Sequence, residues 1–209
     1  MTPIFLASSS PRRRALLEQA GIPFTLLTPR VSEEVDGEPP PPHQLVERLA
    51  RRKAAAGARL VDRGLIIGAD TIVVFRGRVL GKPADSAAAE EMLHLLQGAS
   101  HDVFTGLAVI EQPGGRTMTA WERTRVTFRT LTDEEIRLYA ATGEPADKAG
   151  AYAAQGLGAI FITSIEGCYF NVVGLPLARL AVMLAGFGVH VLALAAGRPA
   201  FINKGRLEE

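Results

Sequence analysis

Apolar runs in the middle of the chain predict a buried strand that carries a charge. The runs at 65–67 and 72–75 are rich in β-branched residues, which favour a covered strand. Between them lies the segment Gly-Ala-Asp-Thr at 68–71, which predicts an interruption of the strand, and Gly68 would let another group approach the backbone closely. A charge inside an apolar run is costly unless it finds a partner or a metal. We therefore expect a functional role for Asp70, although an acid that caps a turn at a strand end fits the same pattern.

The other patterns predict a mixed sheet flanked by helices, that is, an α/β fold. Predicted strands cover residues 3–8, 101–111, 117–129, 160–165 and 169–173, and a hairpin turns at 76–77. Predicted helices cover residues 11–20, 44–61, 86–97, 132–142 and 175–184. A strand followed by a helix at the start, with hairpins later, indicates a mixed rather than a purely parallel sheet. The pattern identifies no partner for the apolar run at 189–196.

A serine-rich loop joins the first strand to the first helix. Ser10 is a favoured N-cap residue, Pro11 suits the first helical position and Gly21 suits the C-terminal stop. The N–H groups and the positive end of the helix dipole, with hydroxyls and Arg12 beside them, predict a phosphate site. Three consecutive arginines in the first turn oppose that dipole, which favours a bound anion over an ordinary capped helix with a solvated basic turn.

Three further segments contain candidate contacts. Lys82 is held between Gly81 and Pro83, where it could contact a phosphate or be an ordinary loop lysine. The small-residue loop at 144–156 has one amide, Gln155, which could contact a flat ligand or bond the loop backbone. The proline-rich segment 29–43 predicts an exposed loop whose acids are solvated, and the cations at 51–53 are typical of a solvated helix face.

Composition indicates a soluble globular protein with one substantial core. The chain has 209 residues, of which 47% are apolar and 22% charged. The net charge of +1 and the aromatic content of 6% argue against a nucleic-acid-binding protein. The single cysteine, Cys168, excludes an internal disulfide and a cysteine-rich zinc site, and is typical of a reducing cytoplasm. We expect no signal peptide, because the N-terminal apolar segment is too short and its arginines follow it instead of preceding it. We expect no transmembrane span, because proline, arginine and glycine interrupt the longest apolar stretch, at 175–196.

Several motifs in register give the chain a resemblance to a known family. They are LASSSPRRRALL, GADTIVV, GKP, HDVFTGLAV, DKAGAYAAQGLG and VVGLP, spread over residues 4–184. In this order and spacing they resemble the Maf family of nucleoside triphosphate pyrophosphatases, also called septum-formation inhibitors. The form DKAGAYxxQG followed by VVGLP is similar to the dTTP/UTP pyrophosphatase branch. Two departures are Ser9, where the family loop usually has glycine, and the turn at 168–171.

The resemblance implies an elongated single domain over residues 1–209, with two lobes around a deep cleft as in Maf and inosine-triphosphatase folds. Residues 186–209 would be a C-terminal extension. It implies Asp70 as the catalytic acid or base and substrate specificity at Arg12, Thr71 and Gln155. It implies phosphate contacts at Ser8, Arg12, Lys53 and Lys82, and metal ligands at Asp70 and Glu33. It further implies a divalent cation (Mg²⁺ or Mn²⁺), a cytoplasmic homodimer, and no nucleic-acid or membrane partner.

The implied reaction is the hydrolysis of dTTP and UTP to the monophosphate and pyrophosphate, with removal of non-canonical nucleotides. Charge accumulates on phosphoryl oxygens in such a reaction, so cations and oriented donors suit it. Asp70 could act as the base, as a metal ligand or as both, and the sequence leaves these alternatives open. The competing hypothesis is a nucleotide-binding regulator of cell division without turnover, which would keep the phosphate loop but would not need Asp70.

Overall fold

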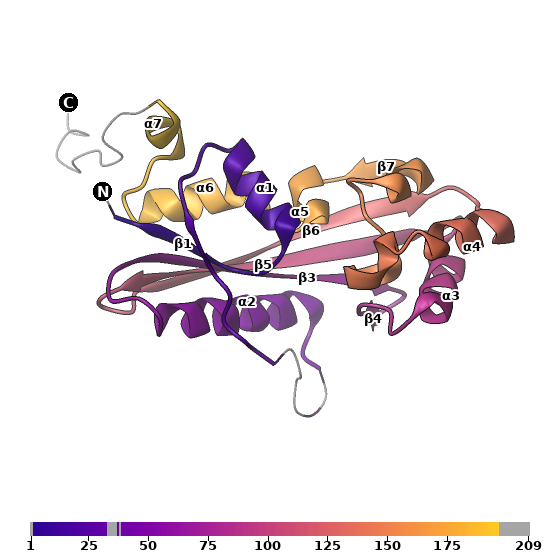
Figure 1. Cartoon of the computed structure of the whole chain (residues 1–209), viewed down its shortest axis with the longest axis horizontal. Coiled ribbons are helices and arrows are strands. Elements are labelled where there is room, and N and C mark those ends of the chain that lie inside the picture. Colours follow the sequence, from indigo (N-terminus) through magenta and orange to yellow (C-terminus); the bar gives the residue numbers. More distant parts are fainter. Residues whose placement is uncertain (1, 33–36, 38, 197–209) are drawn as a thin grey trace.

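A seven-stranded mixed sheet extends through the computed structural model, which describes residues 2–32, 37 and 39–196 (Figure 1). The strands are β1 (Ile4–Ala7), β2 (Thr25–Leu27), β3 (Gly64–Phe75), β4 (Arg78–Leu80), β5 (Ser100–Gln112), β6 (Thr117–Phe128) and β7 (Ile162–Glu166). Their order is β2-β1-β3-β5-β6-β7, with β4 beside β3. β1 runs parallel to β2 and β3, and the other pairs are antiparallel. The predicted α/β fold with a mixed sheet is confirmed.

Helices cover both faces of this sheet. They are α1 (Pro11–Gln19), α2 (Pro42–Ala58), α3 (Ser86–Leu96), α4 (Asp133–Ala141), α5 (Tyr169–Val173), α6 (Leu177–Gly186) and α7 (Val191–Ala195). α2 lies on one face, α1 and α6 lie on the other, and α3 and α4 lie at the far end (Figure 1). The capping box predicted at the start of α4 is present. Of the described helices, none is both long enough and apolar enough to cross a membrane.

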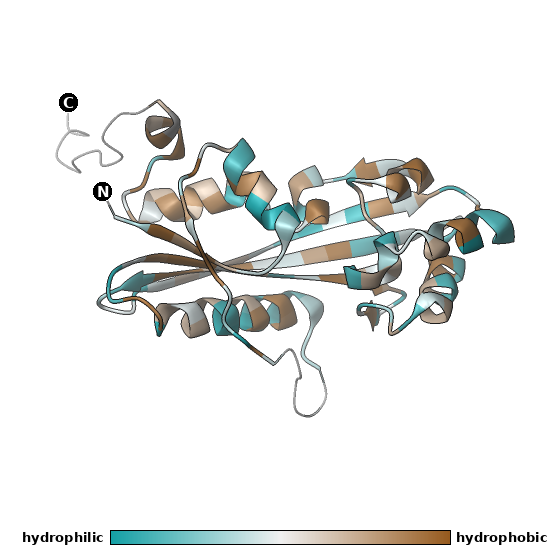
Figure 2. Ribbon diagram, viewed as in Figure 1, coloured by the Kyte–Doolittle hydropathy of each residue, from teal (hydrophilic) through white to brown (hydrophobic). Residues whose placement is uncertain are grey.

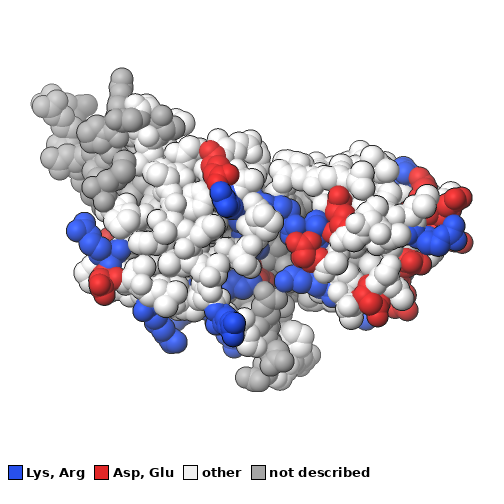
Figure 3. All heavy atoms as spheres, viewed as in Figure 1, with Lys and Arg blue, Asp and Glu red and all other residues white. Residues whose placement is uncertain are grey.

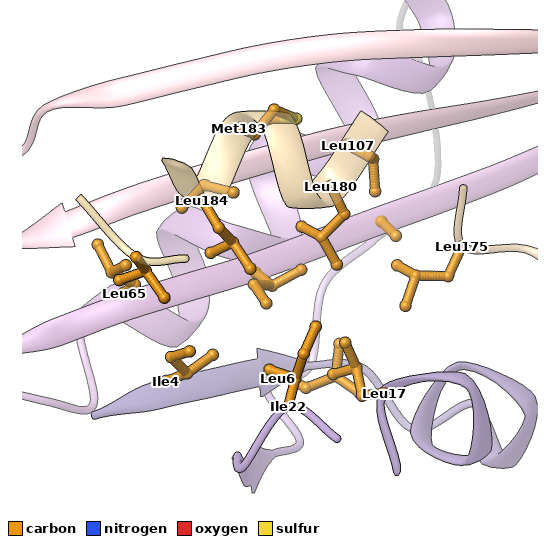
Figure 4. Packing of buried hydrophobic residues seen from close by; sticks show 14 of the residues in the cluster. Ile4, Leu6, Leu17, Ile22, Leu65, Leu107, Leu175, Leu180, Met183 and Leu184 are labelled. Carbon is orange, nitrogen blue, oxygen red and sulfur yellow. The ribbon is translucent and has the colours of Figure 1, made fainter. Parts of the chain in front are cut away.

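Two large hydrophobic clusters form the two lobes of the elongated body. In the first, side chains of β1, β3 and β5 pack against α1 and α6 (Figure 4). In the second, the far ends of β3 and β5 pack with β6, α3 and α4. β3 contributes Leu65 and Ile67 to the first cluster and Val73 and Phe75 to the second. Figure 2 shows hydrophobic residues along the central strands and hydrophilic residues on the exposed ends of α1 and α4.

The interruption predicted at residues 68–71 is wrong, because β3 continues through them and pairs with β5 from Gly64 to Val74. The predicted close approach to Gly68 is confirmed, and its partner is α2. A Cβ at Gly68 would lie 2.3 Å from the Ala50 carbonyl oxygen and 2.6 Å from the Ala54 nitrogen. The absence of a side chain therefore seats α2 directly on the strand that carries Asp70.

The second strand of the pair predicted at 160–173 is also wrong, because Tyr169–Val173 is the helix α5. Gly174 ends this helix in the left-handed conformation, and the N–H of Leu175 bonds the carbonyl of Phe170. Inside it, the Asn171 amide donates to the Val103 carbonyl and to Thr124 Oγ1. The Asn171 side chain thus has partners on both β5 and β6, and these contacts hold the segment as a helix instead of the predicted strand. β7 pairs instead with β6.

The apolar run near the end of the described chain, for which the sequence suggested no partner, joins the first lobe. Val189 and Leu194 are buried in the cluster formed by α1, α6 and the central strands.

Candidate active site

A cleft of about 730 Å³ opens where the two lobes meet. β1 pairs with β3 at residues 65–67 and β4 pairs with it at residues 73–75. Along this edge of β3, no described strand pairs with residues 68–72. Of these residues, Asp70, Thr71 and Ile72 line the cleft. The volume lies within the range of small-molecule sites, roughly 300–1,000 Å³.

The lining of the cleft is strongly cationic. Figure 3 shows Lys and Arg side chains gathered with a few acids in the hollow at the middle of the molecule. Among the described residues, the lining includes two carboxylates, Asp70 and Asp147. Its cations are Arg12, Arg13, Arg30, Lys53, Lys82 and Lys148. This excess of positive charge would attract a polyanion such as a polyphosphate.

Asp70 and Lys53 form an ion pair in the cleft wall. The carboxylate of Asp70, a residue only 6% exposed, contacts the Lys53 ammonium. Lys53 belongs to α2, the helix that packs on Gly68, so the close contact at Gly68 brings the two side chains together. Lys53 is the partner that a charge in an apolar run requires.

Thr71 points to the opposite face of β3 from Asp70, as neighbouring residues in a strand do. Its Oγ1 accepts a hydrogen bond from the Arg13 guanidinium at 3.0 Å and lies 2.9 Å from Thr105 Oγ1. Asp70 thus faces α2 and Thr71 faces α1. Both reach the cleft because this part of β3 is an open edge.

Arg13 is a cleft residue that the sequence reasoning did not single out. It is buried, and its Nε donates to the Gly174 carbonyl at 2.8 Å. A second nitrogen lies 3.3 Å from Ser8 Oγ. The guanidinium thus joins the serine loop, β3 and the turn after α5. The sequence does contain a signal for a buried Arg13, because its spacing from Leu16 and Leu17 places all three on the same face of α1.

Ser8 and Ser10 shape the loop before α1. Ser10 is the N-cap residue, as predicted, but its side chain makes no capping hydrogen bond. Instead its N–H donates to Ser8 Oγ at 3.2 Å, and Ser8 is buried at the cleft wall. The loop therefore presents the beginning of a helix to the cleft, which is a favourable place for an anion.

The loop that carries Gln155 is held from behind by Glu144. This carboxylate accepts hydrogen bonds from the N–H groups of Leu157 and Gly158, each at 3.0 Å, and from the Tyr139 hydroxyl at 2.8 Å. Burial alone would raise the pKa of Glu144, but these hydrogen bonds lower it overall. Gln155 is exposed, and its amide makes no hydrogen bond to the described residues. The alternative of a glutamine bonding the loop backbone is therefore not realised.

Tyr152 lies at the cleft, with its hydroxyl 2.8 Å from His101 Nε2. Burial lowers the pKa of His101 to about 4, so the imidazole is neutral near pH 7. Burial also raises the pKa of the Tyr152 phenol. This neutral pair supports the cleft wall from the second lobe.

The cleft collects nearly all the candidate residues from the sequence. It is lined by Ser8, Arg12, Lys53, Asp70, Thr71, Lys82 and Gln155. Glu33 lies outside the described residues. In the described part of the chain, no group of three or more His, Cys, Asp or Glu side chains is placed to hold a metal ion. The predicted metal site therefore depends on Asp70, one of the two carboxylates in the described lining of the cleft.

Comparison with known proteins gives one family and many relatives. The family model described as Maf-like protein matches residues 3–187. A dTTP/UTP pyrophosphatase of Pelotomaculum thermopropionicum is 56% identical over 92% of this chain and 100% of its own length. A dTTP/UTP pyrophosphatase of Bacillus cereus is 48% identical over 91% of this chain and 98% of its own length. The solved Ham1 protein of Staphylococcus aureus covers 75% of this chain and 77% of its own, at 15% identity and a TM-score of 0.43.

Proposed function

The chain belongs to the family of Maf-like proteins, and on that premise we propose that it hydrolyses dTTP and UTP to the monophosphate and pyrophosphate. The observation that carries the proposal is a cleft that is lined by six cations and has the buried carboxylate of Asp70 in its wall. Relatives that share about half of its residues over nearly their full length are dTTP/UTP pyrophosphatases. The cationic cleft suits a triphosphate, and an acid within it suits the activation of water.

Cleavage between the α and β phosphates requires water to attack the α-phosphorus while pyrophosphate leaves. Negative charge then develops on the phosphoryl oxygens, and fixed cations stabilise it. Arg12, Lys53 and Lys82, together with the start of α1, would supply that field around the phosphates. Ser8 would add a hydroxyl to the same loop. Asp70 would orient the attacking water or accept its proton.

A divalent cation fits the oxygen donors of the cleft. Mg²⁺ in phosphoryl-transfer sites is commonly held by one or two carboxylates together with substrate phosphate oxygens, and Asp70 offers one such carboxylate at the cleft wall. Asp70 would hold the metal, with Glu33 as a second carboxylate by family resemblance. A bound metal would neutralise phosphate charge and lower the pKa of bound water.

The bond cleaved tests the proposal. With Mg²⁺ or Mn²⁺ we expect UTP and dTTP to yield the monophosphate and pyrophosphate in equal amounts, and a chelator to abolish turnover. Pyrophosphate and orthophosphate are assayed separately across the common nucleoside triphosphates. Release of orthophosphate from fresh triphosphate would contradict the proposed reaction. Nucleotide binding without turnover would favour the regulator hypothesis.

Replacement of Gln155 by alanine tests base recognition. An amide offers an acceptor and a donor, which match the adjacent N3–H and carbonyl of uracil and thymine. We expect Gln155→Ala to reduce the kcat/KM ratio of UTP over CTP about tenfold, within the roughly 1–3 kcal/mol of an unpaired polar group. The kcat for UTP should change less than this ratio. An unchanged UTP/CTP ratio would remove Gln155 from the base site.

A further inference from the structure

An ion pair joins the two lobes across the cleft. Arg12 lies in the first turn of α1, beside the core of the first lobe, and Asp147 ends η1 (Glu144–Asp147), which adjoins the second lobe. Arg12 donates to Asp147 Oδ2 at 3.2 Å, although the two residues are 135 positions apart in the sequence. Both side chains line the cleft.

Asp147 is itself fixed on the side away from Arg12. Lys148 Nζ lies 2.6 Å from Asp147 Oδ1 and 2.6 Å from the Glu144 carbonyl oxygen, and its side chain is only 12% exposed. Glu144 also holds the N–H groups that follow Gln155, through its carboxylate. A continuous series of polar contacts therefore runs from Arg12, through Asp147, Lys148 and Glu144, to the loop that carries Gln155.

Arg12 retains donors for a ligand while it is bound to Asp147. The contact uses one terminal nitrogen, and among the described residues the Nε and the other terminal nitrogen have no hydrogen-bond partner. A guanidinium has five N–H donors in a fixed planar arrangement, so one edge can bind a carboxylate while another binds a phosphate. Holding one edge fixes the direction of the other.

We propose that Asp147 is a positioning residue that directs the Arg12 guanidinium toward the substrate phosphates and couples it to the Gln155 loop. The inference rests on the proposed function for the identity of the substrate. Asp147 touches no reacting atom in this account and acts through Arg12. Through the same contacts, binding of the substrate base near Gln155 would favour the correct placement of the substrate phosphates near Arg12.

Charge and exposure support a positioning role over a purely stabilising one. Burial alone would raise the pKa of Asp147, but the hydrogen bond from Lys148 and the charge of Arg12 lower it, so the carboxylate is ionised near pH 7. The Asp147 side chain is 58% exposed, and exposed ion pairs contribute little to folding. A guanidinium that is no longer held in one direction would nevertheless bind the substrate phosphates less tightly.

Asp147→Asn in two backgrounds tests this inference. In the wild-type background we expect the KM for UTP to rise about fivefold while kcat stays within about twofold, as for the loss of a binding contact. In the Arg12→Ala background the same substitution should change KM by less than about twofold, because two residues that act through one contact are not additive. Asp147→Glu keeps the charge and should recover most of the affinity. An equal KM effect in both backgrounds, or a large fall in kcat, would overturn the proposal.

Controls separate this effect from general charge and from the identity of the reaction. Glu122→Gln removes the negative charge from the Arg179–Glu122 ion pair, which lies outside the cleft lining, and should leave KM unchanged. Thermal unfolding checks that each variant folds. If Asp147→Asn does not fold, Asp147→Ser is used instead, because it also removes the negative charge. Affinity for a non-hydrolysable UTP analogue is measured by calorimetry for the same set. If wild type releases no pyrophosphate the proposed function fails, whereas the calorimetric comparison still decides the role of Asp147.

Discussion

Asp70→Asn is expected to lower kcat at least about a hundredfold while the protein remains folded. Asparagine keeps the shape of the side chain but cannot accept a proton, and it is a much weaker partner for a cation. The wild-type carboxylate is buried against the Lys53 ammonium at the open edge of β3. Its loss would weaken both the activation of water and any divalent metal held there. Steady-state kinetics with UTP, together with the melting temperature, measures the effect.

Asp102→Asn is the matched control for this prediction. Asp102 is also a strand aspartate paired with a cation, Arg123 at 2.9 Å, but it is not part of the cleft lining. Its substitution should leave kcat within about twofold of wild type, because Asp102 lies outside the cleft lining and its cationic partners, Arg123 and Arg125, have no proposed role in catalysis. Normal turnover in a folded Asp70→Asn protein would assign the chemistry to another carboxylate, and Glu33 would be the next candidate.

Local sequence patterns predicted the parts of the site that depend on local structure. Ser10, Pro11 and the arginines beyond them indicated the start of a helix facing an anion, and this loop lines the cleft. The apolar run around Asp70 predicted a buried strand, and the acid lies within it. These signals work because caps and buried strands follow from neighbouring residues alone.

Other parts of the site depend on contacts between distant segments. The Arg12–Asp147 pair and the contacts of Arg13 with Gly174 and Thr71 join positions far apart in the chain, so no spacing in the sequence indicates them. The adjacent residues Asp70 and Thr71 both line the cleft, but they lie on opposite faces of β3 and have different partners, Lys53 and Arg13, which the sequence does not indicate. The apolar segment at 169–173 was ambiguous because five residues fit either a strand or one helical turn. Asn171 and Gly174 decide for the helix only through their tertiary and capping contacts.

The contact between α2 and β3 links the fold to the proposed chemistry. Lys53 reaches Asp70 because α2 sits against the bare backbone of Gly68, and Gly106 on β5 meets the same helix at Val46. At both glycines an added Cβ would come closer than 3.0 Å to helix backbone atoms, which cannot rotate away as a side chain can. The distance between the helix and the sheet therefore sets the distance between the two charges.

Gly68→Ala is accordingly expected to impair both stability and turnover. The methyl group would lie 2.3 Å from the Ala50 carbonyl oxygen, so α2 must move outward and Lys53 with it. We expect a loss of about 3 kcal/mol in unfolding free energy, at the upper end of overpacking effects. The kcat/KM for UTP should fall at least about tenfold in the remaining folded protein, because the ammonium is displaced. Urea unfolding and steady-state kinetics on the same preparation measure the two quantities.

Gly81→Ala is the matched control, since a Cβ at Gly81 would meet nothing within 4 Å. Its unfolding free energy should stay within about 0.5 kcal/mol of wild type, as for a substitution into open space. Wild-type stability and activity in Gly68→Ala would show that α2 can move without disturbing the Lys53–Asp70 pair.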